Sequence, residues 1–211
     1  MNATEQEQPL DTLRDIRNIM ERSARFLSLS GWSGIWAGVI ALAGTSVALV
    51  FAKDYYADYD NGGFDGSAYE TLRNRLAYLG IAVFLLAIAG AFLFTYKKVK
   101  RQGLPVWNGA SRRFLINLCL PVLAGAGFIC GFLLYNDWPY IVPSCLVFYG
   151  LGLINAAKFT IDEVRYLGML EVVSGIVCIF FPAAGLYFWA FGFGVLHVVY
   201  GIVMWRKYDR K

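Results

Sequence analysis

Residues 97–113 read KKVKRQGLPVWNGASRR, and this basic stretch separates two long apolar segments of the chain. It holds six lysines and arginines and no acidic residue. Lysine and arginine resist translocation across a lipid bilayer, so a connection of this composition stays on the cytoplasmic side. The stretch therefore predicts a membrane crossing before it and another after it, and it fixes the direction of both.

Six apolar segments lie around this connection, each close to the roughly 20 residues that a helix needs to cross a bilayer. They are continuous rather than alternating, which favours helices over strands. Of the 211 residues, 58% are hydrophobic and 16% are charged, whereas about 25% are charged in an ordinary soluble domain. We predict an all-α, polytopic bundle of six transmembrane helices over residues 29–52, 76–96, 114–135, 138–157, 166–183 and 185–205.

The distribution of positive charge predicts the orientation of the bundle. Six crossings place the N-terminal tail, the second and fourth connections and the C-terminus on one side. All of the chain's 19 lysines and arginines lie on that side except Lys53, Arg73 and Arg75. We expect a multi-pass protein of the bacterial inner membrane with both termini in the cytoplasm. The net charge of +4 is then explained by anionic lipid headgroups, and no nucleic-acid partner is expected.

Three regions follow from this topology. Residues 1–28 form a cytoplasmic tail in which apolar residues recur at helical spacing from Leu10, typical of an amphipathic helix on the membrane surface. Residues 29–205 form the six-helix transmembrane domain, and 206–211 form a basic cytoplasmic tail. Residues 53–75 are expected to be an acidic, tyrosine-rich loop on the opposite side of the membrane.

An internal repeat is visible beneath the hydropathy. Residues 149–155 read YGLGLIN and residues 191–197 read FGFGVLH, each an aromatic residue, Gly-x-Gly, two aliphatic residues and a polar one. The third and fifth segments share GFIC at 127–130 and GIVC at 175–178. These matches predict three helical-hairpin repeats, an arrangement that often places function at the interface between repeats.

The last two segments carry a family resemblance. Gly175-Ile176, Pro182 at the turn, Gly194 and Gly201-Ile202 follow the glycine and proline rhythm of the HdeD-like bacterial acid-resistance membrane proteins. The chain resembles that family over about a third of its length, while the loop at 53–75 and the N-terminal tail depart from it. The resemblance implies tandem helical hairpins and acid-stress biology, and it carries over no catalytic residue.

Polar residues inside apolar segments are costly, so they mark candidate sites. Glu171 is the only acid well inside a predicted span, and His197 is the only histidine in the chain. Both lie on glycine faces, and both lie 13 residues from residue 184, where the fifth and sixth spans turn. We therefore predict that they form a hydrogen-bonded pair inside the bundle. The candidate polar site comprises Glu171, His197, Asn155, Asn117 and Ser33.

Two interpretations of this pair stay open. In one, the acid and the imidazole satisfy each other and fix helix register, a structural role. In the other, the pair is a proton-linked switch, because histidine titrates near neutrality and burial can bring a carboxylic acid into the same range.

No catalytic constellation accompanies the pair. The four cysteines lie in apolar spans without CxxC spacing, HExxH is absent, and no lysine follows a phosphate-binding glycine loop. We therefore expect no enzyme activity, no metal and no cofactor. The sequence favours a non-enzymatic protein of stress-response, sensing or accessory type, with a small proton-linked transporter or channel as the alternative. Besides the lipid bilayer, glycine-lined helices make a homo-oligomer or a membrane-protein partner an expected interaction.

Overall fold

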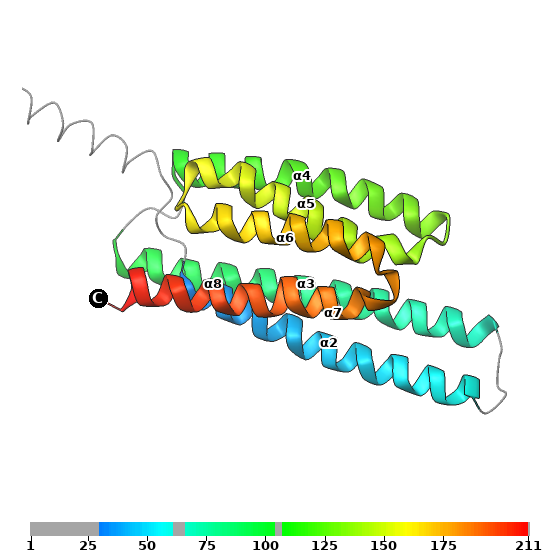
Figure 1. Ribbon diagram of the computed structural model, residues 1–211. Coiled ribbons are helices and arrows are strands. Elements are labelled where there is room, and N and C mark those ends of the chain that lie inside the picture. The colour runs from blue at the N-terminus through cyan, green and yellow to red at the C-terminus, as the bar shows by residue number, and fades with distance from the viewer. Residues whose placement is uncertain (1–29, 61–65, 104–106, 211) are drawn as a thin grey trace, which may run out of the picture.

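The computed structural model of the protein describes residues 30–60, 66–103 and 107–210. The predicted surface helix of residues 1–28 lies outside the described residues. The main helices in Figure 1 are α2 (Gly31–Asp60), α3 (Gly66–Arg101), α4 (Gly109–Leu134), α5 (Ile141–Ala156), α6 (Glu163–Phe180), α7 (Gly185–Trp189) and α8 (His197–Met204).

Short elements join or extend these helices. The 3-10 turns η1 (Trp138–Tyr140) and η2 (Ala157–Phe159) flank α5, and η3 (Pro182–Ala184) precedes α7. Two π-helical stretches, η4 (Ala190–Leu196) and η5 (Trp205–Asp209), run on without a break from α7 and α8. We call the continuous stretch from α7 to η5 the C-terminal helix.

The described part of the chain is all-helical, and five of its helices are long and apolar enough to cross a membrane. The exception is α6, the fifth predicted span. Its 18 residues would extend about 27 Å at 1.5 Å per residue, slightly less than the ~30 Å of a hydrocarbon core. It also carries Glu163, Arg165 and Glu171. The prediction of an all-helical fold is confirmed for the described residues, and the five long apolar helices are consistent with a multi-pass membrane protein.

The helices pack in a particular order that the sequence did not indicate. The helix α2 packs against α3 and against the C-terminal helix, and α5 packs against α4 and against α6. The first two predicted hairpins are thus packed pairs, whereas α6 and the C-terminal helix each contact a helix outside their hairpin more extensively than each other. The threefold repeat stays a prediction.

Glycine allows the closest of these contacts. A Cβ added at Gly150 of α5 would lie 2.6 Å from the carbonyl oxygen of Gly168 in α6, and one added at Gly168 would lie 2.7 Å from the Gly150 oxygen. Between α2 and the C-terminal helix, a Cβ on Gly38 would lie 2.7 Å from the oxygen of Gly194. Small residues that let helix backbones approach are a common means of helix association in lipid.

The helices are longer than the predicted spans. Residues 53–75 were expected to form a loop, but α2 continues to Asp60 and α3 begins at Gly66. Extending an existing helix adds one hydrogen bond per residue without a new nucleation cost, so a helix can continue past the end of its apolar segment. Tyr55 and Tyr69 meet across the two helices, with ring centroids 6.3 Å apart. Similarly, the C-terminal helix continues through Asp209, into the segment expected to be a basic tail.

The topology gathers alternate helix ends. We call the basic end the one where α2, α4 and α6 begin and where α3, α5 and the C-terminal helix finish (Figure 1). The connections at the other end, which we call the opposite end, include the turn at Pro182. There Arg73 of α3 donates a hydrogen bond to the Asn136 side chain and lies 5.2 Å from the Trp138 ring centroid, which ties α3 to the turn between α4 and α5.

Candidate functional site

Glu171 and His197 lie side by side inside the bundle. The helix α6 supplies Glu171, which has no exposed surface, and α8 begins at His197, which is 6% exposed. The imidazole Nδ1 is 3.3 Å from Glu171 Oε1. The two side chains are therefore close enough for an ion pair.

The predicted hydrogen bond between Glu171 and His197 is not formed, and the imidazole bonds to the backbone instead. Nδ1 of His197 is 3.1 Å from the backbone carbonyl oxygen of Gly192, and this is its hydrogen bond. Neither carboxylate oxygen of Glu171 receives a hydrogen bond from the residues that the structure describes. Buried polar groups in proteins almost always have such partners, so a carboxylate without one is exceptional.

Tyr149 of α5 completes the cluster from the other side of the imidazole. Its hydroxyl is 2.9 Å from His197 Nε2, and the two rings are stacked with centroids 5.5 Å apart. The Gly192 carbonyl can only accept, so Nδ1 carries a proton. The Tyr149 hydroxyl can donate to a neutral Nε2 or accept from a protonated one, so this geometry accommodates both charge states of the histidine.

A π-helical stretch shapes the site. η4 spans Ala190–Leu196 and includes Gly192. Such widened turns occur inside α-helices mostly as single insertions, frequently at functional sites. Glycine is also sterically required here, because a Cβ on Gly192 would lie 2.6 Å from Glu171 Oε2 and 2.5 Å from Leu146 Cδ2. The Gly192 backbone therefore packs directly against the Glu171 carboxylate.

An aromatic stack covers the imidazole and the phenol toward the opposite end. The Phe193 ring lies 5.4 Å from that of Tyr149 and 6.0 Å from that of His197. Trp189, one turn earlier, lies 4.6 Å from Phe193. All of these distances join ring centroids.

Asn117 and Asn155 form a second polar contact. The Asn155 amide donates to the backbone oxygen of Asn117 at 3.0 Å and to its side-chain oxygen at 3.1 Å. The Asn117 amide in turn donates to the Arg113 carbonyl at 2.8 Å. The two bonds from Asn155 join α5 to α4, so the pair has the character of a structural link between the two helices.

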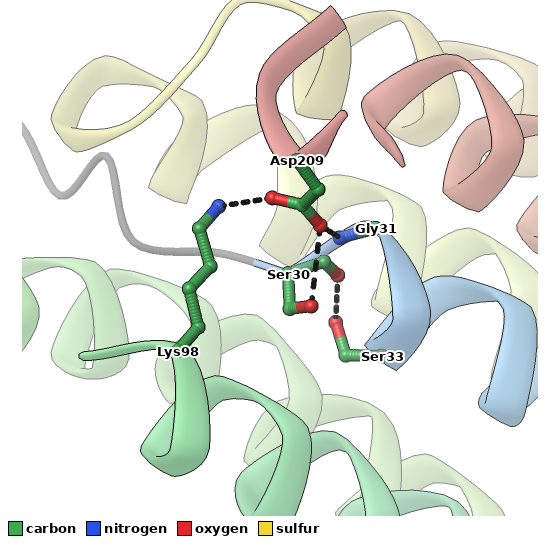
Figure 2. A network of polar contacts seen from close by, with 5 residues as sticks. All are labelled: Ser30, Gly31, Ser33, Lys98 and Asp209. Carbon is green, nitrogen blue, oxygen red and sulfur yellow. Dashed lines mark hydrogen bonds and ion pairs between the residues drawn. The ribbon is translucent and has the colours of Figure 1, made fainter. Parts of the chain in front are cut away.

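Ser33 belongs to a third group, at the basic end (Figure 2). Its hydroxyl donates to the Ser30 carbonyl at 2.5 Å. The carboxylate of Asp209 accepts from the Gly31 backbone N–H at 2.8 Å and from the Ser30 hydroxyl at 3.3 Å, and it lies 2.7 Å from Lys98 Nζ. An acidic group at a helix N-terminus accepts hydrogen bonds from the free backbone N–H groups there and interacts favourably with the helix dipole. Asp209 thereby ties α2, α3 and the C-terminal helix together.

A fourth polar contact lies beyond the buried cluster at the same end. Glu163, the first residue of α6, accepts hydrogen bonds from Lys207 and from the Tyr208 hydroxyl, the latter at 3.1 Å. Partial burial would raise the pKa of Glu163, but the hydrogen bonds from Lys207, the backbone and Tyr208 together outweigh it and lower the pKa below its usual 4.5.

The structure brings together some of the predicted site residues and separates others. Glu171 and His197 are in contact, Asn117 and Asn155 contact each other, and Ser33 lies at the basic end with Asp209. Tyr149 and Gly192 are the residues that sequence reasoning missed as members of the site. The aromatic-Gly-x-Gly motif contains both, and it was the available signal. Within the described residues, no three His, Cys, Asp or Glu side chains gather closely enough to hold a metal ion.

Comparisons with known proteins give no assignment, since no family model, curated protein or solved structure matches the chain. The functional argument therefore rests on the geometry of the buried cluster.

Proposed function

We propose that this chain is a non-enzymatic, multi-pass protein of the bacterial inner membrane that acts in stress response, sensing or as an accessory partner. Its basic end faces the cytoplasm, as the charge distribution favours. The cluster of Glu171, His197 and Tyr149 is its proton-responsive element.

One observation carries this proposal: a fully buried carboxylate that receives no hydrogen bond while it lies 3.3 Å from an imidazole. A purely structural polar pair would satisfy its own atoms, because an unsatisfied buried acceptor costs about 1–3 kcal/mol. Glu171 does not satisfy its atoms in this way. The group is poised to change charge state, which is how polar residues in membrane spans commonly serve function.

The cluster has two forms with the same number of protons. A neutral carboxylic acid can lie beside a neutral imidazole, or a carboxylate can lie beside an imidazolium. Adding one proton to the carboxylate–imidazolium form removes the attraction between α6 and the C-terminal helix. Removing one proton instead leaves a buried carboxylate without its counter-ion. Either change alters how firmly these two helices are held, and a partner protein could detect that difference.

The alternative function is a small proton-linked transporter or channel that uses Glu171 and His197 as its polar gate. The observation that favours it is η4, the π-helical stretch beside the acid. Irregular helices near the middle of a membrane commonly form the ion sites of transporters.

Infrared difference spectroscopy of the reconstituted protein tests the proton-responsive element. We expect a carboxyl band that changes as the pH is stepped, disappears in Glu171→Gln and shifts in His197→Ala. Glu70→Gln, at an exposed acid of α3, is the matched control and should leave that band unchanged. A Glu171 carboxyl band that stays constant as the pH is stepped would refute the proposal.

A flux measurement then separates the two functions. Liposomes with a pH-sensitive dye inside should show the same proton leak with wild type and with Glu171→Gln if the protein is a sensor or accessory. Proton flux that depends on Glu171 would establish the transporter alternative instead.

A further inference from the structure

Polar groups continue from the buried cluster toward the basic end. Tyr200 of α8 lies three residues beyond His197 in that direction. Further toward the basic end, Glu163 and Tyr208 are joined by a 3.1 Å hydrogen bond. Both Tyr149 and Tyr200 pack against the same buried cluster around Leu153. Hydroxyl and carboxyl groups therefore follow one another from the site to the surface of the basic end.

The route in the other direction is apolar and aromatic. Phe193 and Trp189 stack between the cluster and the opposite end. The titratable groups of α5 and α6 on that side are the thiols of Cys145 and Cys178, which are weak hydrogen-bonding groups. Along the contact with η4 and α8, α2 has no titratable side chain from Gly31 to Ala52. Tyr187 of α7 is two-thirds exposed, on the outside of the bundle.

The space at Glu171 restricts what can bind there. A single methyl group on Gly192 would lie 2.6 Å from Oε2 and 2.5 Å from Leu146. Metal cations such as Ca²⁺ require six to eight oxygen ligands, and Mg²⁺ keeps several waters. On the Gly192 side, the packing around this carboxylate therefore leaves no room for a hydrated cation.

From this asymmetry we infer that Glu171 and His197 exchange protons with the basic end alone, so that the site responds to cytoplasmic pH and is closed to the opposite side. This inference rests on the proposed function and adds to it the direction of proton access. The polar series on one side and the aromatic stack on the other are the observations that carry it.

The transfer itself is balanced and involves no change of oxidation state. The Tyr149 hydroxyl gives its proton to Nε2 of His197 as the Nδ1 proton leaves its hydrogen bond to the Gly192 carbonyl and passes to Glu171 Oε1, 3.3 Å away. The phenol oxygen regains a proton from a water molecule or from the Tyr200 hydroxyl. One proton thus moves toward Glu171, and the reverse sequence returns it to the basic end.

Infrared spectroscopy on sealed vesicles of opposite orientation tests the direction of access. Membrane vesicles are adsorbed on an internal-reflection element, the pH of the outer buffer is stepped, and the pH inside is held by a concentrated buffer. Tryptic cleavage at the basic end reports orientation. In vesicles with the basic end outside, the Glu171 carboxyl band, identified by its absence in Glu171→Gln, should follow the outer pH. In the inverted vesicles it should ignore the outer pH.

The possible results distinguish the direction of proton access from the proposed function itself. A band that follows the outer pH in both preparations, or only in the inverted one, overturns one-sided access and leaves the proton-responsive element intact. A band that never changes, or never appears, overturns the proposed function itself. Two variants sharpen the test: Phe193→Ala should admit the response from the opposite side, and Tyr149→Phe should slow the response from the basic end at least severalfold.

Discussion

Replacing Gly150 by alanine should push α5 away from α6. The new Cβ would lie 2.6 Å from the Gly168 carbonyl oxygen and 2.9 Å from the Val172 backbone nitrogen. Ordinary van der Waals contacts of a Cβ begin at 3.4 Å, so the helices must separate by about 0.8 Å at this point. Both obstacles are backbone atoms, which cannot rotate out of the way.

The magnitude follows from two opposing effects. Overpacking of this kind costs about 1–3 kcal/mol, while alanine favours a helix interior over glycine by about 0.8–1 kcal/mol. Gly127→Ala in α4 is the matched control, because nothing in the described structure lies within 4 Å of a Cβ at that position. The control gains the helix preference without the steric cost. The difference between the two variants should therefore be the steric cost itself, ~1–3 kcal/mol.

The assay is reversible unfolding of both variants in the same micelles, followed by loss of helical circular dichroism as a denaturing detergent is added. Gly150→Ala should unfold at a lower fraction of denaturing detergent than Gly127→Ala. Two variants with free energies of unfolding equal within about 0.5 kcal/mol would refute the reasoning. The α5–α6 contact would then be too loose to hold Tyr149 and Glu171 at a fixed separation.

Three further outcomes follow from single contacts. Tyr149→Phe keeps the ring but loses the hydroxyl, and we expect the free energy of unfolding to fall by about 0.5–1.5 kcal/mol, measured in the same assay; an unchanged value would mean that this hydrogen bond is not formed. Asp209→Ala removes the acceptor of the Gly31 N–H and the ion-pair partner of Lys98, so it should cost about 1–2 kcal/mol and speed hydrogen exchange at the start of α2; unaltered exchange there would contradict the capping role. The depressed pKa of Glu163 means that its stabilising contribution is present above pH 4.5 and is lost as the pH falls through the lower folded-state value. The stability difference between wild type and Glu163→Gln should therefore shrink on acidification from pH 6 to 3, and parallel curves would show that Lys207 and Tyr208 do not hold the carboxylate.

Hydropathy and charge were sufficient to predict the helical bundle, because a membrane restricts lipid-exposed backbone to few structures. Hydropathy and charge predict α6 less clearly, because its three charged residues and its modest length weaken the apolar signal. The ends of α2 and α3 were missed for a related reason. Composition marks where a helix leaves the lipid, and it does not mark where the backbone stops being helical.

The candidate site could be predicted only in part. Glu171 and His197 stand out because an acid and a histidine are rare in apolar spans. Tyr149 does not stand out, since tyrosine is common in membrane helices as a packing or interfacial residue, and its hydroxyl gains meaning only from the imidazole opposite. Asp209 was hidden by its place in a charged segment near the C-terminus. Its role depends on the N-terminus of α2 lying beside it, a contact between residues 178 positions apart.

That separation has a consequence for how the protein is made. At 5–20 residues per second, synthesis of the 178 residues between Gly31 and Asp209 takes roughly 9 to 36 s. For much of that interval α2 lacks both the carboxylate at its N-terminus and the C-terminal helix against its glycine face. This contact can therefore form only at the end of translation, after all the other helices have been synthesised. A nascent chain released before the C-terminal helix is made would leave that glycine face of α2 open, a form that membrane quality control could tell from the finished protein.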